Sequence, residues 1–182
     1  MDQDERERQA GAARVARKDL AEQGVVGVAT TWVDNSGVTR VKAVPLARLE
    51  TAARWGIGAS PVFDAFLPDD DIVAGRVAGG PVGDLRLHPD LDRLTVLAEQ
   101  PGWAWAPATR YQQDGTAHPQ DQRSRAAAAV EALANAGYTA RMAFEIEWAL
   151  STTAPEFTPA AHGPAYGYTR MIERSDYVRD LL

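Results

Sequence analysis

The sequence predicts an α+β fold, and three observations support this class. Runs rich in β-branched and aromatic residues, such as residues 25–33 and 38–44, alternate with alanine- and leucine-rich stretches of helical spacing. These first two runs are separated by DNSG, which reads as a hairpin turn, and are followed at once by a helix-like stretch. The 182 residues are 45% hydrophobic, which is enough to bury a core.

The N-terminal half is expected to contain a helix, a hairpin and a second helix. Residues 1–8 are charged with both signs and should fray, whereas the Ala, Val and Leu spacing of residues 9–23 suits a helix that Gly24 ends. Pro45 suits the first turn of the second helix, and Gly56 suits its C-terminal cap. A hairpin followed by a helix is how a β-grasp-like unit begins.

The middle of the chain is expected to alternate loops with short strands. Residues 56–71 combine glycine, proline and acidic residues, which favours a loop that presents its side chains outward. Short strand patterns occupy residues 83–98 and 103–111, the second of which ends in a turn. An alanine-rich helix is predicted for residues 121–137, with Gly137 at its end.

Residues 137–150, GYTARMAFEIEWAL, place two carboxylates among large apolar side chains. If this segment is a strand, Glu145 and Glu147 share one face and stand roughly 7 Å apart, which is twice the strand rise. Like charges at that distance repel, so either water screens them or a cation binds between them. Alternating glutamates are common on the solvated face of a sheet, and the pattern alone favours that interpretation.

Charge and composition exclude several classes of protein. A net charge of −6 and a pI of about 5.1, without a basic run, argue against a nucleic-acid partner. Because cysteine is absent, disulfides, zinc-thiolate sites and thiol nucleophiles are excluded, and a cytoplasmic location is the default expectation. The N-terminus lacks an apolar signal region, and no run of apolar residues is long enough to span a membrane.

Other residues with possible chemistry are expected to be structural. His88, His118 and His162 lie in turn or loop contexts without a ligand spacing, so they are predicted to be surface or turn histidines. Trp103 and Trp105 share one face of a predicted strand and are expected in the core or at a subunit interface.

Several stretches of the chain, taken in order, resemble the glutamine synthetase family. ARMAFEIEW resembles the Gly-x-Glu-x-Glu-Phe strand that opens the catalytic domain, and GDLRLHPDLDRLTVLAEQPGWAWA is similar to a segment upstream of it. YQQDGTAHPQDQRSRAAAAVEAL resembles the family's strand, Asp-Gly turn, proline, arginine and helix, with Arg123 at the arginine. GPAYGYTRMIERSDYVRDLL is similar to the approach to the family's His-rich motif. The likeness looks closer to the divergent branch that includes γ-glutamyl-amine-forming enzymes.

This resemblance implies a particular domain order. Residues 1–23 would form an N-terminal helix region, residues 24–118 a β-grasp-like N-terminal domain, and residues 119–182 the first strands and helix of an incomplete antiparallel α+β catalytic domain. The family's His-rich motif, nucleotide-binding segment and catalytic arginines lie beyond residue 182. The chain is therefore expected to be the N-terminal portion of an enzyme and inactive in isolation. Family members stack as rings, which implies a homo-oligomer.

The resemblance also implies a reaction and its cofactors. In glutamine synthetases, ATP phosphorylates the side-chain carboxylate of glutamate, and ammonia or an amine then displaces phosphate. Divalent cations offset the negative charges gathered at that point, and carboxylates suit Mg²⁺ or Mn²⁺. By resemblance, Glu145 and Glu147 would each ligate a different metal ion.

A loop at residues 55–66 is the second implied site. In the family, Asp-Gly-Ser-Ser at this place reaches into the neighbouring subunit's site, where the acid helps to hold ammonium. Ser60 matches that pattern, but Gly58 and Ala59 precede it, so Asp64 is the candidate replacement for the acid. This departure favours a bulkier amine as acceptor. The alternative is that Ser60 and Asp64 merely cap turns.

Two rival functions remain open at this point. One is a non-catalytic regulatory or subunit-interaction protein derived from the same fold, which would bind no divalent cation. The other is a hydrolase that uses Glu145 and Glu147 as an acid/base pair, as an inverting glycosidase does. The sequence gives no sign of the sugar cleft that such an enzyme needs.

Overall fold

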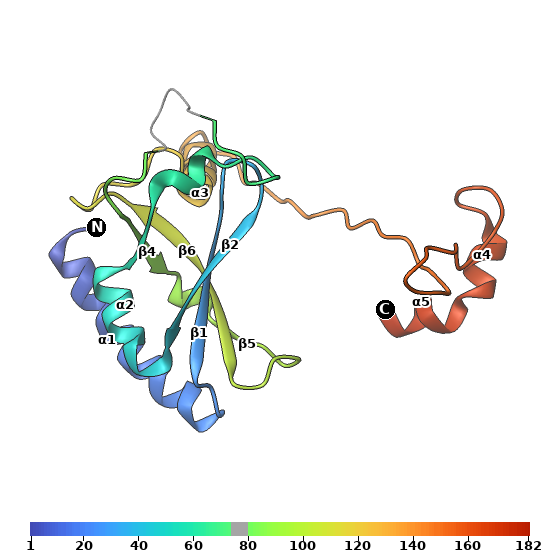
Figure 1. Cartoon of the computed structure of the whole chain (residues 1–182), viewed down its shortest axis with the longest axis horizontal. Helices are drawn as coiled ribbons and strands as arrows, with labels where there is room; N and C mark the ends of the chain where they lie inside the picture. Colours follow the sequence, from blue (N-terminus) through green and yellow to red (C-terminus); the bar gives the residue numbers. More distant parts are fainter. Residues whose placement is uncertain (74–79) are drawn as a thin grey trace. The chain divides into compact units, whose positions relative to one another are not determined.

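The computed structural model describes residues 1–73 and 80–182, which divide into two compact units (Figure 1). The N-terminal unit is residues 1–140 and the C-terminal unit is residues 141–182. The helices and strands of the N-terminal unit are, in order, α1 (Gln3–Glu22), β1 (Gly27–Val33), β2 (Thr39–Pro45), η1 (Leu46–Arg48), α2 (Leu49–Trp55), β3 (Ile57–Ala59), η2 (Pro61–Ala65), β4 (Leu85–Pro89), η3 (Leu91–Arg93), β5 (Thr95–Val96), β6 (Trp103–Tyr111) and α3 (Gln122–Asn135), where η marks a 3₁₀ helix. The C-terminal unit contains α4 (Tyr168–Glu173) and α5 (Ser175–Leu181).

The sheet of the N-terminal unit is mixed, with strand order β2-β1-β6-β4-β3 and β5 paired to β6. β1 and β2 form the predicted antiparallel hairpin, and β1 runs parallel to β6. The register places Val28 of β1 opposite Val44 and beside Ala104. A hairpin and a helix followed by a central parallel pair agree with the predicted β-grasp-like α+β fold, which is confirmed.

α1 begins earlier than predicted because its first turn is capped. The side chain of Asp2 accepts a hydrogen bond from the backbone N–H of Glu5 at 2.8 Å, which satisfies one donor of the first turn. The expected fraying of residues 1–8 is therefore wrong. At the other end, Gly24 adopts a φ of 77°, and the N–H of Val25 bonds the carbonyl of Leu20, so that the helix ends as predicted.

The main hydrophobic core lies where α1 and α2 pack against the sheet, and these helices run side by side (Figure 1). Its buried members are Ala13, Leu20, Val25, Val28, Leu46, Leu49, Ala53 and Ala104. A second, smaller cluster joins Trp32, Ala59, Leu87 and Ala108, with Phe63 of η2 packed against it. The second cluster fixes the segment from β3 through η2, which was predicted to be an outward-facing loop.

α3 is grouped with the sheet, so the first compact unit continues beyond the predicted domain boundary at residue 118. Asp121 begins α3 by accepting a hydrogen bond from the N–H of Ser124 at 2.9 Å. Gly137 follows the helix with a φ of 82°, as predicted for its C-terminal cap. Among the residues that the structure describes, no helix is both long and apolar enough to cross a membrane.

Candidate functional site

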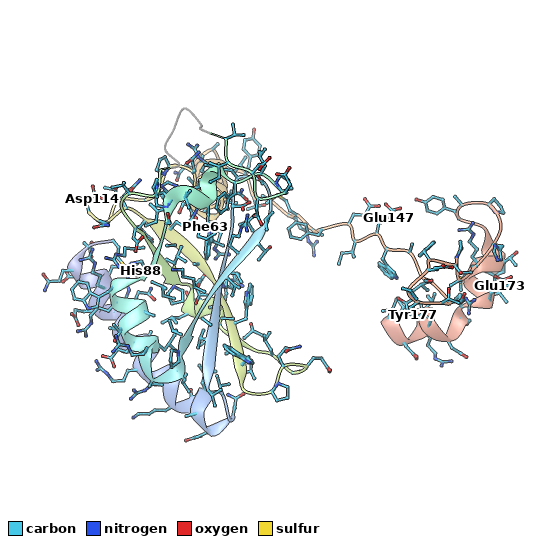
Figure 2. All side chains as sticks on the ribbon, in the orientation of Figure 1. Phe63, His88, Asp114, Glu147, Glu173 and Tyr177 are labelled. Atoms are coloured by element: carbon cyan, nitrogen blue, oxygen red, sulfur yellow. The ribbon has the colours of Figure 1, made fainter. Side chains whose placement is uncertain are left out.

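In the predicted amine-site loop, residues 55–66, strand β3 is followed by a 3₁₀ helix that Ser60 caps. The Oγ atom of Ser60 accepts a hydrogen bond from the N–H of Val62 at 3.3 Å, and Pro61 occupies the first position of η2. Phe63 packs edge-on against Trp32, with ring centroids 5.5 Å apart (Figure 2 labels Phe63). These contacts anchor the loop to β1, and they give Ser60 the capping role that was the alternative prediction.

Asp64 points into a buried polar cluster. One of its carboxylate oxygens accepts from Nη1 of Arg110 at 2.6 Å, and the other lies 2.9 Å from Nε2 of His118. The side chains of all three residues are only 2% exposed. On the far side of the guanidinium, Nε of Arg110 donates to Asp121 at 3.3 Å. The cluster thus joins the η2 loop, β6 and the start of α3.

The environment of Asp64 keeps its carboxylate charged. Burial alone disfavours the charge and would raise the pKa, but the hydrogen bonds from His118 and Arg110 outweigh burial and hold the pKa below its usual value. Both oxygens of Asp64 are engaged within its own chain. The geometry therefore offers no support for Asp64 as an amine ligand in a neighbouring subunit, and that role of Ser60 and Asp64 stays a prediction.

Glu145 and Glu147 lie on a segment where the structure differs from the predicted strand. Residues 139–150 form neither helix nor strand, and both glutamates are exposed (Figure 2 labels Glu147). Their apolar neighbours are exposed too, with Phe144 at 96% and Ile146 at 75%. A strand needs a partner to accept its hydrogen bonds, and the nearest β-bridge joins Ser151 to Pro159.

The two glutamates do not make a metal site by themselves. Their oxygens are of the kind that Mg²⁺ and Mn²⁺ prefer. Within residues 1–73 and 80–182, however, no group of three or more His, Cys, Asp or Glu side chains could hold an ion. A cation between Glu145 and Glu147 would need further ligands from outside the described residues.

The histidines show where sequence reasoning missed structure. His88 is buried at 6% exposure within β4, so its prediction as a surface or turn residue is wrong, whereas His118 lies in a turn as predicted but is buried, at 3% exposure. His162 is exposed, in agreement with the prediction.

One sequence signal could have predicted the buried polar cluster around His118. Ala104, Ala106, Ala108 and Arg110 are alternate residues of β6, and a charge continuing such a buried row needs a partner.

Other predicted structural residues are found in such roles. Arg123, at the place of the family's arginine, donates to Asp90 at 2.5 Å and forms an ion pair with it. Trp105 is half-buried, and its Nε1 donates to the hydroxyl of Thr31 at 2.9 Å, whereas Trp103 is 39% exposed. Neither tryptophan belongs to the buried core, and their predicted place at a subunit interface stays a prediction.

The C-terminal unit contains a pocket of about 700 Å³ between α4, α5 and the preceding loop. Nε1 of Trp148 donates to the hydroxyl of Tyr177 at 2.9 Å on its edge. Arg170 and Arg174 line it, but both donate to backbone carbonyls, of Gly163 and Ala160. These arginines thus hold the loop in place.

Comparison with known proteins decides the family. A family model described as the glutamine synthetase N-terminal domain matches residues 10–118. The chain belongs to the glutamine synthetase family. Over 168 residues, or 90% of its length, it is 52% identical to the gamma-glutamylpolyamine synthetase GlnA3 of Streptomyces coelicolor. The chain spans only 36% of the length of that relative.

Solved structures agree with this member of the glutamine synthetase family in fold. A novel glutamine synthase homolog is 31% identical, with a TM-score of 0.55 over 63% of this chain and 28% of that one. GmaS in complex with ADP gives a TM-score of 0.60 at 20% identity, covering 93% of this chain and 37% of that one. GmaS without ligand gives 0.61 at 18% identity, with 91% and 38% covered. The two GmaS structures show the shared fold alone.

Proposed function

We propose that this chain is the N-terminal portion of an ATP-dependent ligase that joins the side-chain carboxylate of glutamate to an amine. The observation that carries the proposal is the 52% identity, over 168 residues, to a gamma-glutamylpolyamine synthetase. That relative's name also favours a polyamine over ammonia as the acceptor. The departure from Asp-Gly-Ser-Ser before Ser60 supports the same preference.

The proposed reaction has two balanced steps. ATP transfers its terminal phosphoryl group to the glutamate carboxylate, which gives ADP and γ-glutamyl phosphate. The amine nitrogen then attacks the acyl carbon, the bond from carbon to the phosphate oxygen breaks, and inorganic phosphate leaves as the nitrogen loses a proton. The first step is needed because a carboxylate is a poor electrophile, whereas its acyl phosphate is a good one.

Glu145 and Glu147 are proposed to bind Mg²⁺ or Mn²⁺ in the complete enzyme. A divalent cation would supply charge neutralisation where phosphate oxygens and carboxylates meet. The support is the oxygen chemistry of the two side chains and their exposure on residues 139–150, which leaves them accessible to further ligands. The remaining ligands must come from residues outside this chain or from another subunit.

The buried Asp64 cluster is proposed to position the loop that begins at Ser60. Asp64, Arg110 and His118 fix η2 against β6, so Ser60 is presented from a rigid support. In a homo-oligomeric ring, which the resemblance implies, this loop would face the neighbouring subunit. A rigid loop contributes to a shared site without an ordering cost on assembly.

A chimera tests the proposed activity. This chain would replace the matching segment of the GlnA3 relative, and product would be followed by mass spectrometry with ATP, glutamate and either a polyamine or ammonium. We expect ATP-dependent γ-glutamyl-polyamine formation, at least tenfold faster than γ-glutamyl transfer to ammonium. A folded chimera without activity would reject the ligase proposal, and a preference for ammonium would reject the acceptor.

Two variants of the chimera test the metal role. Glu145→Gln should raise the Mn²⁺ concentration needed for half-maximal rate, because it removes a carboxylate ligand. Glu156→Gln changes an exposed glutamate of the same unit and should leave that concentration unchanged.

The 182-residue chain alone should form no γ-glutamyl hydroxamate from ATP, glutamate and hydroxylamine. Robust ATP-dependent product from it would show that the catalytic residues lie within this chain.

A further inference from the structure

A pocket of about 320 Å³ lies in the N-terminal unit, and its lining does not include Asp64, Arg110 or His118. Four elements line it: α1 and α2, strand β4, and the end of β6 with the turn that follows. The lining residues are Arg6, Trp55, Arg86, His88, Tyr111, Gln112, Gln113 and Gly115. Every ionisable side chain in this lining except Tyr111 is basic.

The two arginines of this pocket differ from others in the same unit. Arg14, Arg40, Arg54, Arg110 and Arg123 each have a carboxylate within 4.0 Å. Within the described part of the chain, no such ion pair is found for Arg6 or Arg86, even though Arg86 is half-buried. The pocket therefore holds two positive charges without a fixed counter-charge.

Arg6 is held in place before any ligand binds. Its guanidinium carbon lies 5.4 Å from the centroid of the Trp55 ring, in a cation–π contact. Its Nε atom is buried and has no hydrogen-bond partner among the described residues. A buried N–H donor without a partner is costly, and an acceptor that entered the pocket would remove that cost.

His88 lines the pocket together with the two arginines (Figure 2 labels His88). Its Nδ1 lies 2.9 Å from the carbonyl oxygen of Ala53, which can only accept, so Nδ1 carries the hydrogen. The ring edge packs against Tyr111 with centroids 5.3 Å apart. Burial lowers the pKa of His88, and the positive charges of Arg6, the chain N-terminus and Arg86 lower it further.

Gly56, at the end of α2, lies close to Arg86 and His88. A Cβ atom at this position would lie 2.8 Å from Cβ of Arg86 and 2.9 Å from Nε2 of His88. Its φ of 71° is also one that glycine adopts most readily. A side chain at position 56 would therefore displace Arg86 and His88.

We propose that the Arg6–Arg86 pocket is a binding site for a small oxyanion bearing a phosphate or carboxylate group, formed by residues other than Glu145 and Glu147. Two guanidinium groups match the oxygens of such anions, and the amide of Gln113 adds a hydrogen-bond donor, whereas the amide nitrogen of Gln112 already lies 3.1 Å from Nδ1 of His118. Because its lining residues come from α1, α2 and β4 of the N-terminal unit, a bound anion would contact these three elements. This inference does not depend on the proposed ligase activity.

Calorimetric titration of the 182-residue chain tests the site at constant ionic strength. One titration uses inorganic phosphate, the second succinate, and a third chloride to measure general screening. We expect saturable binding of phosphate or succinate, whichever chemistry the site prefers, and no saturable chloride binding. If neither oxyanion binds saturably at millimolar concentration, the proposal is wrong.

Charge-removing variants locate the binding. Arg86→Gln and Arg6→Gln should each weaken oxyanion binding at least tenfold. Arg93→Gln removes an exposed arginine of η3 that does not line the pocket, and it should leave binding unchanged. Far-ultraviolet circular dichroism shows whether each variant is folded. If Arg6→Gln is unfolded, the oxyanion affinity of Arg86→Gln alone tests the proposal. Equal weakening by all three variants, or no weakening by Arg86→Gln, would overturn the proposal.

Discussion

Asp64 shows how a residue can matter more to the fold than its place in a loop suggests. It lies in η2, yet its side chain is 2% exposed and bonds to Arg110 and His118, which are 46 and 54 residues away in sequence. Burying these charged groups is tolerable only because each is hydrogen-bonded and paired. Removing one partner should therefore lower the free energy of unfolding substantially.

We expect Asp64→Asn to lower the free energy of unfolding by about 3 kcal/mol, because it leaves Arg110 short of a buried counter-charge. Urea denaturation followed by tryptophan fluorescence measures this. Asp70→Asn is the matched control, since the Asp70 side chain is 71% exposed and its pair with Arg40 should contribute no more than about 1 kcal/mol. Equal losses in the two variants would contradict a special role for the cluster.

The same variant gives a pH signature. The pKa of Asp64 lies below its ordinary value of 3.8, so the unfolded chain takes up this proton first as the pH falls. The contribution of Asp64 to stability is present above pH 3.8 and is lost as the pH falls through its folded pKa. Asp64→Asn should therefore lose less stability than the wild type in that range.

At the scale of elements, the sequence patterns predicted those features that depend on residues close together in the chain. The hairpin of β1 and β2 and the glycine ends of α1, α2 and α3 depend on neighbours within a few residues. The parallel pairing of β1 with β6 joins residues 76 positions apart, such as Thr31 with Pro107 and Gly27 with Trp103. No short pattern encodes such a contact, and the hairpin followed by a helix indicated only how a β-grasp-like unit begins.

The strand expected within residues 137–150 is missing for a related reason. Alternation describes what a strand would bury, but a strand forms only when a partner accepts its backbone hydrogen bonds. The described residues of this chain provide no partner strand there, and Phe144 and Ile146 are left exposed. The candidate carboxylates were found from sequence, but their ligand geometry depends on contacts that these residues do not make.

We expect this exposed row to drive self-association of the 182-residue chain. Phe144→Ser combined with Ile146→Ser should lower the sedimentation-average mass at high protein concentration, because it removes apolar surface. Val15→Ser changes a side chain of α1 that is 64% exposed and should have little effect. If self-association persists unchanged in the double variant, the apolar surface that drives it lies elsewhere, for example at the exposed Trp103 and Val41 of the sheet.

At the scale of the whole chain, the two units differ in what holds them together. The N-terminal unit has two buried clusters and the Asp64 network. In the C-terminal unit, no residue is buried, and α4 and α5 are short. A segment of about forty residues without a buried core is near the lower limit for independent folding. Stability should therefore reside in residues 1–140.

This difference gives a truncation experiment. Residues 1–140, produced alone, should unfold cooperatively with a midpoint within a few degrees of the 182-residue chain, because both buried clusters are retained. Residues 141–182, produced alone, should show no cooperative transition, since nothing buried would be lost on heating. Differential scanning calorimetry measures both. A large fall in the midpoint of residues 1–140 would mean that the C-terminal unit stabilises the sheet, and the assignment of stability to the two clusters and the Asp64 network would fail.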